Sequence, residues 1–193
     1  KLLKNSSIKY IIIYGVASAM SFLHSHDLIH CNLTIYNILL DSLFHPKITG
    51  FNYSKTTSDA STISDSYRFT KLKGSLENFA PEVFTNKEFS KSSDIYSFGI
   101  IMYQILTRLK EFIQYSTLLE LIQKVTIENE QPDMDRIPKF YQELIQKCLS
   151  KYPTERPTFD EIVSFLKTDP NLTNDEEFQN YVKFIDQSPK SFN

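Results

Sequence analysis

The chain has 193 residues, enough for one domain with a substantial core. Its net charge of −2, with 41% hydrophobic and 23% charged residues, is typical of ordinary globular proteins and argues against a nucleic-acid or membrane-surface role that depends on bulk charge. The two cysteines are too few for a disulfide framework and favour a reducing compartment, so we expect a cytoplasmic protein. We find no signal peptide and no run that is apolar enough to span a bilayer.

Residues 1–7 are polar and have no core-forming periodicity. Because the chain begins at Lys1 rather than Met, we expect this segment to be the point where a longer chain is truncated. From Ile8 to Leu23 the apolar residues recur at helical spacing, which predicts an amphipathic helix. A polar loop follows from His30. The runs 38–40 and 46–49 then predict a short β-hairpin.

Residues 52–73 are crowded with Ser and Thr and have no apolar period, which predicts an irregular loop. Its hydroxyls could accept phosphate from another enzyme, with basic side chains nearby to pair with it, although the safer interpretation is a solvated loop. The candidate positions are Thr56, Thr57, Ser61, Thr62, Ser64, Ser66, Tyr67 and Thr70.

The most apolar helix is predicted over 93–107, where apolar residues occupy nearly every face. Such a helix must be buried on all sides, so we expect the fold to be built around it. Shorter helices are predicted over 118–125 and 139–149. Thr158, with Glu161 three residues later, has the spacing of a capping box. Beyond residue 168 the composition becomes polar, and we expect a tail over 169–193 with one amphipathic helix.

Four motifs occur in a fixed order along the chain. The first is His30-Cys31-Asn32-Leu33 with Asn37, and the later ones are Gly50-Phe51-Asn52, Phe79-Ala80-Pro81-Glu82 and Ser93-Asp94-Ile95-Tyr96-Ser97-Phe98-Gly99. Together they resemble the catalytic loop, metal loop, Ala-Pro-Glu motif and central helix of the protein kinase superfamily. The central-helix motif most resembles tyrosine-kinase-like sequences.

The resemblance covers roughly 8–166 and implies the large, C-terminal lobe of a kinase. We therefore expect a mainly α (α+β) fold over 8–168, a helical bundle around a buried central helix with a small hairpin. No Gly-rich loop and no strand lysine precede Ile8, so we expect the small lobe to be absent.

The resemblance implies losses at the positions that carry the chemistry. Asn32 stands where kinases have the catalytic base Asp, and an amide cannot take up a proton near neutral pH. Thr34 replaces the catalytic-loop Lys, and Gly50 replaces the metal-binding Asp. Asn37 and Leu39 match nucleotide and magnesium positions, but one neutral oxygen is a poor ligand for a hard cation. We therefore expect Asn37 to be structural.

Other matched positions imply structural roles. His30 and Phe51 should pack together, and Asp94 should bond the backbone of the catalytic loop or cap its own helix. Glu82 and Arg156 match a buried ion pair that ties the Ala-Pro-Glu motif to the last helices. Cys31 replaces an Arg that reads activation-segment phosphate in many kinases, so we expect that switch to be missing.

The substitutions lead us to expect a pseudokinase that is not an enzyme and acts as a signalling scaffold or regulatory binding module. We expect protein partners, no nucleic acid, no membrane and no cofactor, and leave the oligomeric state open. Two alternatives stay open. One is a weak ATP-dependent Ser/Thr/Tyr kinase, using magnesium, with an upstream small lobe. The other is a non-functional fragment that does not fold alone.

Overall fold

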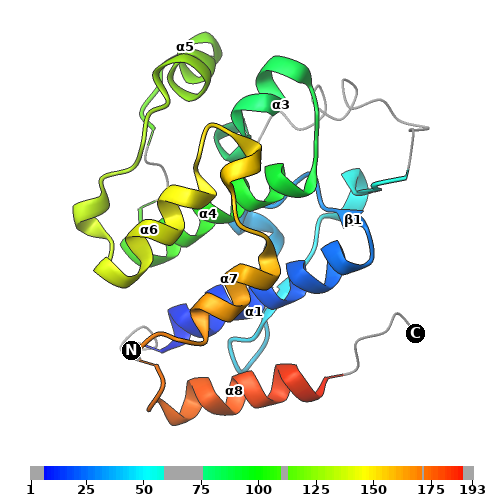
Figure 1. Cartoon of the computed structure of the whole chain (residues 1–193), viewed down its shortest axis with the longest axis vertical. Helices are drawn as coiled ribbons and strands as arrows, with labels where there is room; N and C mark the ends of the chain where they lie inside the picture. The colour runs from blue at the N-terminus through cyan, green and yellow to red at the C-terminus, as the bar shows by residue number, and fades with distance from the viewer. Residues whose placement is uncertain (1–6, 59–75, 110–112, 171, 189–193) are drawn as a thin grey trace.

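Helix α4 (Lys91–Thr107) runs through the middle of the computed structural model (Figure 1), which describes residues 7–58, 76–109, 113–170 and 172–188. Every residue from Ser93 to Gln104 is buried, which confirms the predicted central helix. The helix begins two residues earlier than predicted because Ser90 caps it. The Ser90 hydroxyl accepts the Ser93 N–H at 3.2 Å, and the Ser93 hydroxyl accepts the Ser90 N–H at 3.0 Å.

Helix α1 (Ile8–Ser25) packs against α4 and α7 (Phe159–Leu166). Among the described residues, α1 is the helix that is long and apolar enough to cross a membrane by length and composition, a property we had not expected of any segment. Half of it is buried inside the fold, which is the pattern of a core helix. The predicted capping box of α7 is confirmed, because Glu161 accepts the Thr158 N–H at 2.7 Å.

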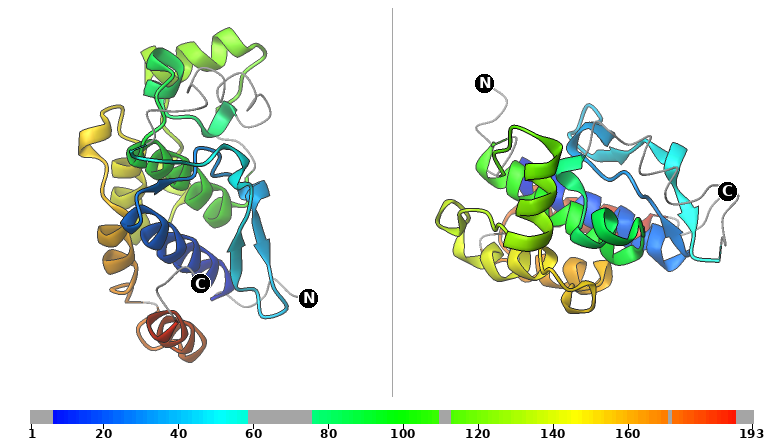
Figure 2. Two further views of the ribbon diagram at one scale, coloured as in Figure 1. Left: turned by 90° about the vertical axis from the view of Figure 1, so that its right-hand side faces the viewer. Right: turned by 90° about the horizontal axis from the view of Figure 1, so that it is seen from above.

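Two short antiparallel strand pairs flank α1. Strand β2 (Ile38–Leu40) pairs with β3 (Pro46–Ile48), which confirms the predicted hairpin, and Ile38 lies opposite Ile48. Figure 2 (left) shows this hairpin standing beside α1. Strand β1 (Leu28–Ile29) pairs with β4 (Lys55–Thr56), a contact too short to leave a sequence pattern. The two pairs bring the segment after β1 close to the segment after β3.

Three further helices complete the lobe: α3 (Pro81–Asn86) and α5 (Leu118–Gln123) lie above α4 in Figure 1, and α6 (Lys139–Cys148) packs beside α4. The helix predicted over 118–125 continues as a π-helical turn, Lys124–Glu128. Single 3₁₀ turns connect the longer elements at Ile35–Asn37, Phe51–Tyr53, Leu76–Asn78, Met134–Arg136 and Pro153–Glu155.

Helix α8 (Glu176–Gln187) lies below α1 and the hairpin in Figure 1. Its Phe178 ring meets Tyr14 of α1 edge-on at 5.5 Å, and its Tyr181 ring stacks on His45 of the hairpin turn at 4.4 Å. The predicted amphipathic helix is therefore present. It is part of the common core and not of a separate tail, because its apolar face is buried against α1. The boundary that we predicted at residue 168 does not mark the edge of the core.

The predicted fold class is confirmed, because the described residues are mainly helical and pack around α4 with a small hairpin. Strands in the described residues form only the two short pairs, and no small-lobe sheet lies among these residues. The helical core places the polar segment 30–37 on one side of α4, next to the residues that follow β3.

Candidate functional site

The buried carboxylate of Asp94 holds the start of the catalytic-loop segment. Asp94 is 1% exposed, and its Oδ2 and Oδ1 atoms accept the backbone N–H groups of His30 at 2.8 Å and Cys31 at 3.0 Å. His24 Nε2 lies 3.0 Å from the same carboxylate. Cys31 has a φ of 63°, so these hydrogen bonds stabilise a backbone conformation that is costly for a residue other than glycine. Asp94 therefore acts on the loop, while Ser90 caps its helix.

His30 is buried and makes a hydrogen bond through each ring nitrogen. Its Nε2 lies 2.9 Å from the Thr49 carbonyl oxygen, and its Nδ1 accepts the Asn32 N–H at 3.2 Å. These partners assign the neutral tautomer with the proton on Nε2. Burial lowers the pKa of His30, although nearby Asp94 opposes this shift. With its ring 4.9 Å from that of Phe51, His30 is a packed structural histidine.

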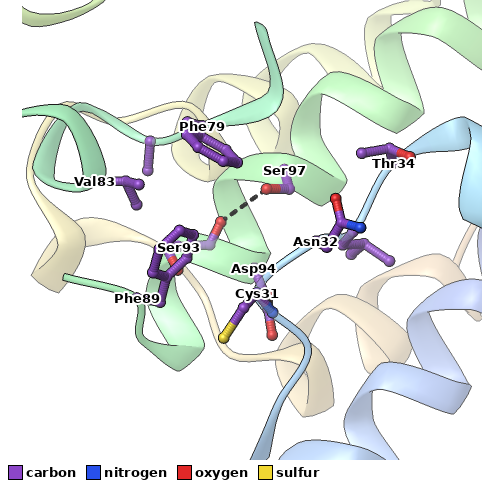
Figure 3. A pocket seen from close by; sticks show the side chains of 11 residues that line it. Cys31, Asn32, Thr34, Phe79, Val83, Phe89, Ser93, Asp94 and Ser97 are labelled. Carbon is purple, nitrogen blue, oxygen red and sulfur yellow. Dashed lines mark hydrogen bonds between the residues drawn. The ribbon is translucent and has the colours of Figure 1, made fainter. Parts of the chain in front are cut away.

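Asn32 faces helix α4 across a cavity of about 10 Å³, roughly the size of one water molecule (Figure 3). Its Oδ1 atom is buried and has no hydrogen-bond partner among the described residues. Thr34 and Ser97 line the same cavity, and Thr34 is buried. An amide oxygen here can accept a hydrogen bond from a hydroxyl group, but it brings no charge and cannot take the proton. Thr34 brings no cation to hold a phosphate.

Asn37 and Gly50, which the resemblance matches to the family's metal positions, lie side by side. Asn37 Nδ2 donates to the Asn32 carbonyl oxygen at 2.8 Å, and the Asn37 carbonyl oxygen accepts the Thr49 N–H at 2.9 Å. Gly50 has a φ of 83°, and a Cβ atom there would lie 2.6 Å from Asn37 Cγ. The amide of Asn37 thus occupies the space that a side chain at position 50 would need.

The described residues do not fit the magnesium site of an active kinase. They contain no group of three or more His, Cys, Asp or Glu side chains able to hold a metal ion. Oδ1 of Asn37 is a neutral ligand, whereas magnesium in such sites is bound through carboxylates and phosphates. Leu39, on β2, is 56% exposed. The geometry therefore supports no reaction step through a bound metal.

Glu82 and Arg156 form a paired, two-point contact between α3 and the turn before α7. Arg156 Nη1 lies 2.6 Å from Glu82 Oε1, and Nη2 lies 2.9 Å from Oε2. Nη1 and Nε of Arg156 also donate to the carbonyl oxygens of Ser92 and Ser150, both at 2.9 Å. The guanidinium group is fully buried and sits 5.1 Å from the centre of the Tyr96 ring. The geometry is that of a structural ion pair.

Sequence reasoning missed two hydroxyl groups that brace this region. Ser54 donates to the His30 carbonyl oxygen at 3.2 Å, and Ser97 donates to the Asn78 carbonyl oxygen at 2.8 Å. Each is a single residue far along the chain from its partner, so no local motif could have identified it. Of the proposed phosphorylation sites, Thr56 and Thr57 are described. The six from Ser61 to Thr70 lie outside the described residues.

Comparison with known proteins identifies the family. A model of the protein tyrosine and serine/threonine kinase family matches residues 3–166. The dual specificity protein kinase shkC of Dictyostelium discoideum is 34% identical over 78% of this chain and 30% of its own length. The mouse receptor-interacting serine/threonine-protein kinase 4 is 32% identical over 81% of this chain and 21% of its own. The RGS domain-containing serine/threonine-protein kinase A of D. discoideum is 30% identical over 80% of this chain and 13% of its own length.

These names correct one of our predictions. We expected a protein that is not an enzyme, but the similar proteins are named serine/threonine and dual-specificity kinases, which are enzymes. The chain spans less than a third of the length of these three relatives. The order of the motifs, the buried central helix and the family match over residues 3–166 agree: this chain belongs to the protein tyrosine and serine/threonine kinase family, and its fold is that of the family's large lobe.

Proposed function

We propose that this lobe works in kinase signalling as a scaffold or regulatory module that binds other proteins, with phosphoryl transfer strongly slowed. The observation that carries the proposal is the buried, uncharged amide oxygen of Asn32, the residue that the resemblance matches to the family's base. A general base contributes roughly 10²–10⁴-fold to the rate of such reactions. The loss of charge at Thr34 and Gly50 should slow transfer further, because phosphoryl transfer depends on positioning and charge neutralisation.

A role in protein binding is supported by the surface around α5. Apolar side chains are exposed on this helix and on the turn that follows, with Leu119 74% and Ile127 73% exposed, and Leu118 is also exposed. Clusters of this kind are typical of protein interaction sites. We propose protein partners in the cytoplasm, without nucleic acid, membrane or resident cofactor, because the net charge is only −2 and the described residues do not fit a magnesium site.

A second candidate is a weak ATP-dependent Ser/Thr/Tyr kinase. The names of the relatives favour it, since they are serine/threonine and dual-specificity kinases. It requires residues outside this chain to supply a small lobe and to hold ATP and magnesium. Asn32 would then orient the substrate hydroxyl group without removing its proton, and positioning alone would provide the acceleration.

The deciding experiment uses the longest natural form of the protein. Transfer of labelled phosphate from ATP to a mixture of Ser, Thr and Tyr peptides is measured for the wild type and for Asn37→Ala. We expect slow transfer by the wild type that Asn37→Ala leaves unchanged, because the proposal assigns no metal to Asn37. Phosphorylation by the wild type that Asn37→Ala abolishes would overturn the scaffold proposal in favour of the second candidate. A purified chain that is molten or aggregated would instead support a non-functional fragment.

Thermal unfolding with ATP adds a binding measurement that does not depend on turnover. A ligand at one hundred times its dissociation constant stabilises a fold by about 2.7 kcal/mol, which is a readable shift. We expect no shift that depends on magnesium when samples with magnesium and with EDTA are compared. A shift that requires magnesium would show that other residues hold the metal, which contradicts the proposal.

A further inference from the structure

A pocket lies at the end of α4, beside the turn Ile35–Asn37 that continues the catalytic-loop segment. Its volume is about 350 Å³, at the lower end of the range of roughly 300–1,000 Å³ that ligand sites occupy. Because this turn follows Thr34 directly and contains Asn37, a group bound in the pocket would lie next to the candidate site. The lining residues are Ile35, Tyr36, Gln104, Arg108 and Leu109.

The pocket combines an apolar wall with a single positive charge. Tyr36 is 68% exposed and Leu109 is also exposed, so both side chains are accessible to a partner. Among the described residues that line the pocket, Arg108 carries a charge and none carries a carboxylate. This combination suits a peptide segment that has an acidic side chain next to an apolar one.

The guanidinium group of Arg108 has no protein partner in the described part of the chain. Of the three arginines that the structure describes, Arg136 has its Nε atom 3.0 Å from Asp133, and Arg156 pairs with Glu82. Arg108 makes neither an ion pair nor a side-chain hydrogen bond with the described residues. A guanidinium group can donate two parallel hydrogen bonds to a carboxylate or phosphate. The pocket therefore presents a set of unused donors to an oxyanion.

A basic side chain at the end of a helix can serve only to cap that helix, as Lys87 does for α3. Lys87 has a φ of 59°, and its Nζ atom donates to the Phe84 carbonyl oxygen at 2.9 Å. Arg108 ends α4 with a similar φ of 62°, but here the backbone N–H caps the helix, donating to the Gln104 carbonyl oxygen at 2.9 Å. The side chain of Arg108 is not needed for the cap, so it is available to a ligand.

We propose that this pocket binds an acidic side chain of a partner protein, and that Arg108 selects that side chain. The carboxylate or phosphate lies against the guanidinium group, and a neighbouring apolar residue of the partner packs on Tyr36 and Leu109. The inference names the chemistry of one partner segment and rests on the proposed role in protein binding. The net charge of −2 disfavours a nucleic acid as the source of the anion.

The test uses a library of nine-residue peptides that carry Glu, phosphoserine, Gln, Ser or Lys in equal amounts at the central position, flanked by small and apolar residues. The library is passed, without ATP, over the immobilised longest natural form of the protein, and bound peptides are identified by mass spectrometry. We expect Glu or phosphoserine to be enriched about fivefold or more over Gln and Ser. Enrichment of Glu alone assigns a carboxylate, and enrichment of phosphoserine alone assigns a phosphate.

Variants connect the preference to the pocket. Arg108→Gln should abolish the enrichment of acidic residues, and Arg108→Glu should replace it by enrichment of Lys. Arg136→Gln is the matched control, because this arginine is exposed but already paired with Asp133, and it should keep the wild-type preference. Leu119→Ser should remove peptides that bind through the surface around α5 and leave the acidic preference unchanged. The melting temperature of Arg108→Gln should equal that of the wild type.

The proposal is overturned if the wild type shows no preference for acidic residues, or if Arg108→Gln retains that preference. Equal loss in Arg108→Gln and Arg136→Gln would also overturn it, because overall charge would then explain the effect. Capture needs no ATP, so phosphoryl transfer that depends on Asn37, which would contradict the proposed scaffold role, leaves this result unchanged. The failure of one proposal is therefore distinguishable from the failure of the other.

Discussion

The side chain of Asn37 fills the space next to Gly50, where a Cβ atom would lie 2.6 Å from Asn37 Cγ and Nδ2. Asn37 is held there by its hydrogen bond to the Asn32 carbonyl oxygen. The amide and the glycine therefore form a matched pair: one side chain occupies what the other residue leaves empty. Restoring a carboxylate at position 50 requires Asn37 to move as well.

We predict that Gly50→Ala lowers the free energy of unfolding by about 1–3 kcal/mol, because alanine is strained at a φ of 83° and its methyl group meets Asn37. Chemical denaturation measures the change. In a double-mutant cycle with Asn37→Ala, the cost of Gly50→Ala should be smaller because the clash is removed. A neutral Gly50→Ala substitution would show that the loop relaxes freely.

The contact between Asn37 and Gly50 also affects whether phosphoryl transfer can be restored. Asn32→Asp with Gly50→Asp should return some phosphoryl transfer in the longest natural form if a small lobe is present. Asp tolerates positive φ better than most residues, but its Cβ still displaces Asn37. Peptide phosphorylation measures the outcome, with Asn32→Asp alone as the control. No return of activity would mean that more than the two carboxylates is missing.

The ion pair between Glu82 and Arg156 should be costly to break. Glu82→Gln leaves a fully buried guanidinium group without its counter-charge, so we expect a loss of about 3–5 kcal/mol in the free energy of unfolding. The matched control is Glu143→Gln, which breaks the exposed pair with Lys147 and should leave the free energy of unfolding essentially unchanged. Similar effects from both variants would contradict a special role for the buried pair.

Gly15 should be intolerant of the substitution that usually stabilises a helix. Replacing a mid-helix glycine by alanine normally gains about 0.5–1 kcal/mol. Here a Cβ atom would lie 2.3 Å from Tyr181 Oη and 2.5 Å from Pro46 Cγ, so we expect Gly15→Ala to lose about 1–3 kcal/mol instead. Adding Tyr181→Phe should recover part of this loss. A higher denaturation midpoint for Gly15→Ala would contradict the close packing of Tyr181, on α8, against Gly15 of α1.

Stability should depend on pH through His30. Burial lowers the pKa of this histidine in the folded state below the value of about 6.5 expected in the unfolded chain. The unfolded state therefore binds the proton more readily. Stability from His30 is complete above about pH 6.5 and is lost as the pH falls toward the folded-state pKa. NMR titration of the His30 Cε1 proton gives the pKa directly, and a value at or above 6.5 would contradict the assignment.

The sequence alone determined the family and the main elements of the lobe. Residues 93–107 are apolar on nearly every face, which is possible only for a helix buried on all sides, and Thr158 and Glu161 form a local cap. The substitutions at Asn32 and Gly50 are likewise visible because the motifs around them keep their order. The expectation that the protein is not an enzyme was wrong because it rested on these positions alone.

Only the tertiary structure decided how distant residues meet. No local pattern could place the Phe178 ring of α8 edge-on against the Tyr14 ring of α1, 5.5 Å away. The same holds for Asn37 beside Gly50 and for Tyr181 over Gly15. Periodicity shows which face of a helix is apolar, but it does not show which element covers that face. That choice depends on packing between segments far apart in the chain. It places α8, which we predicted as part of a polar tail, against the hydrophobic core.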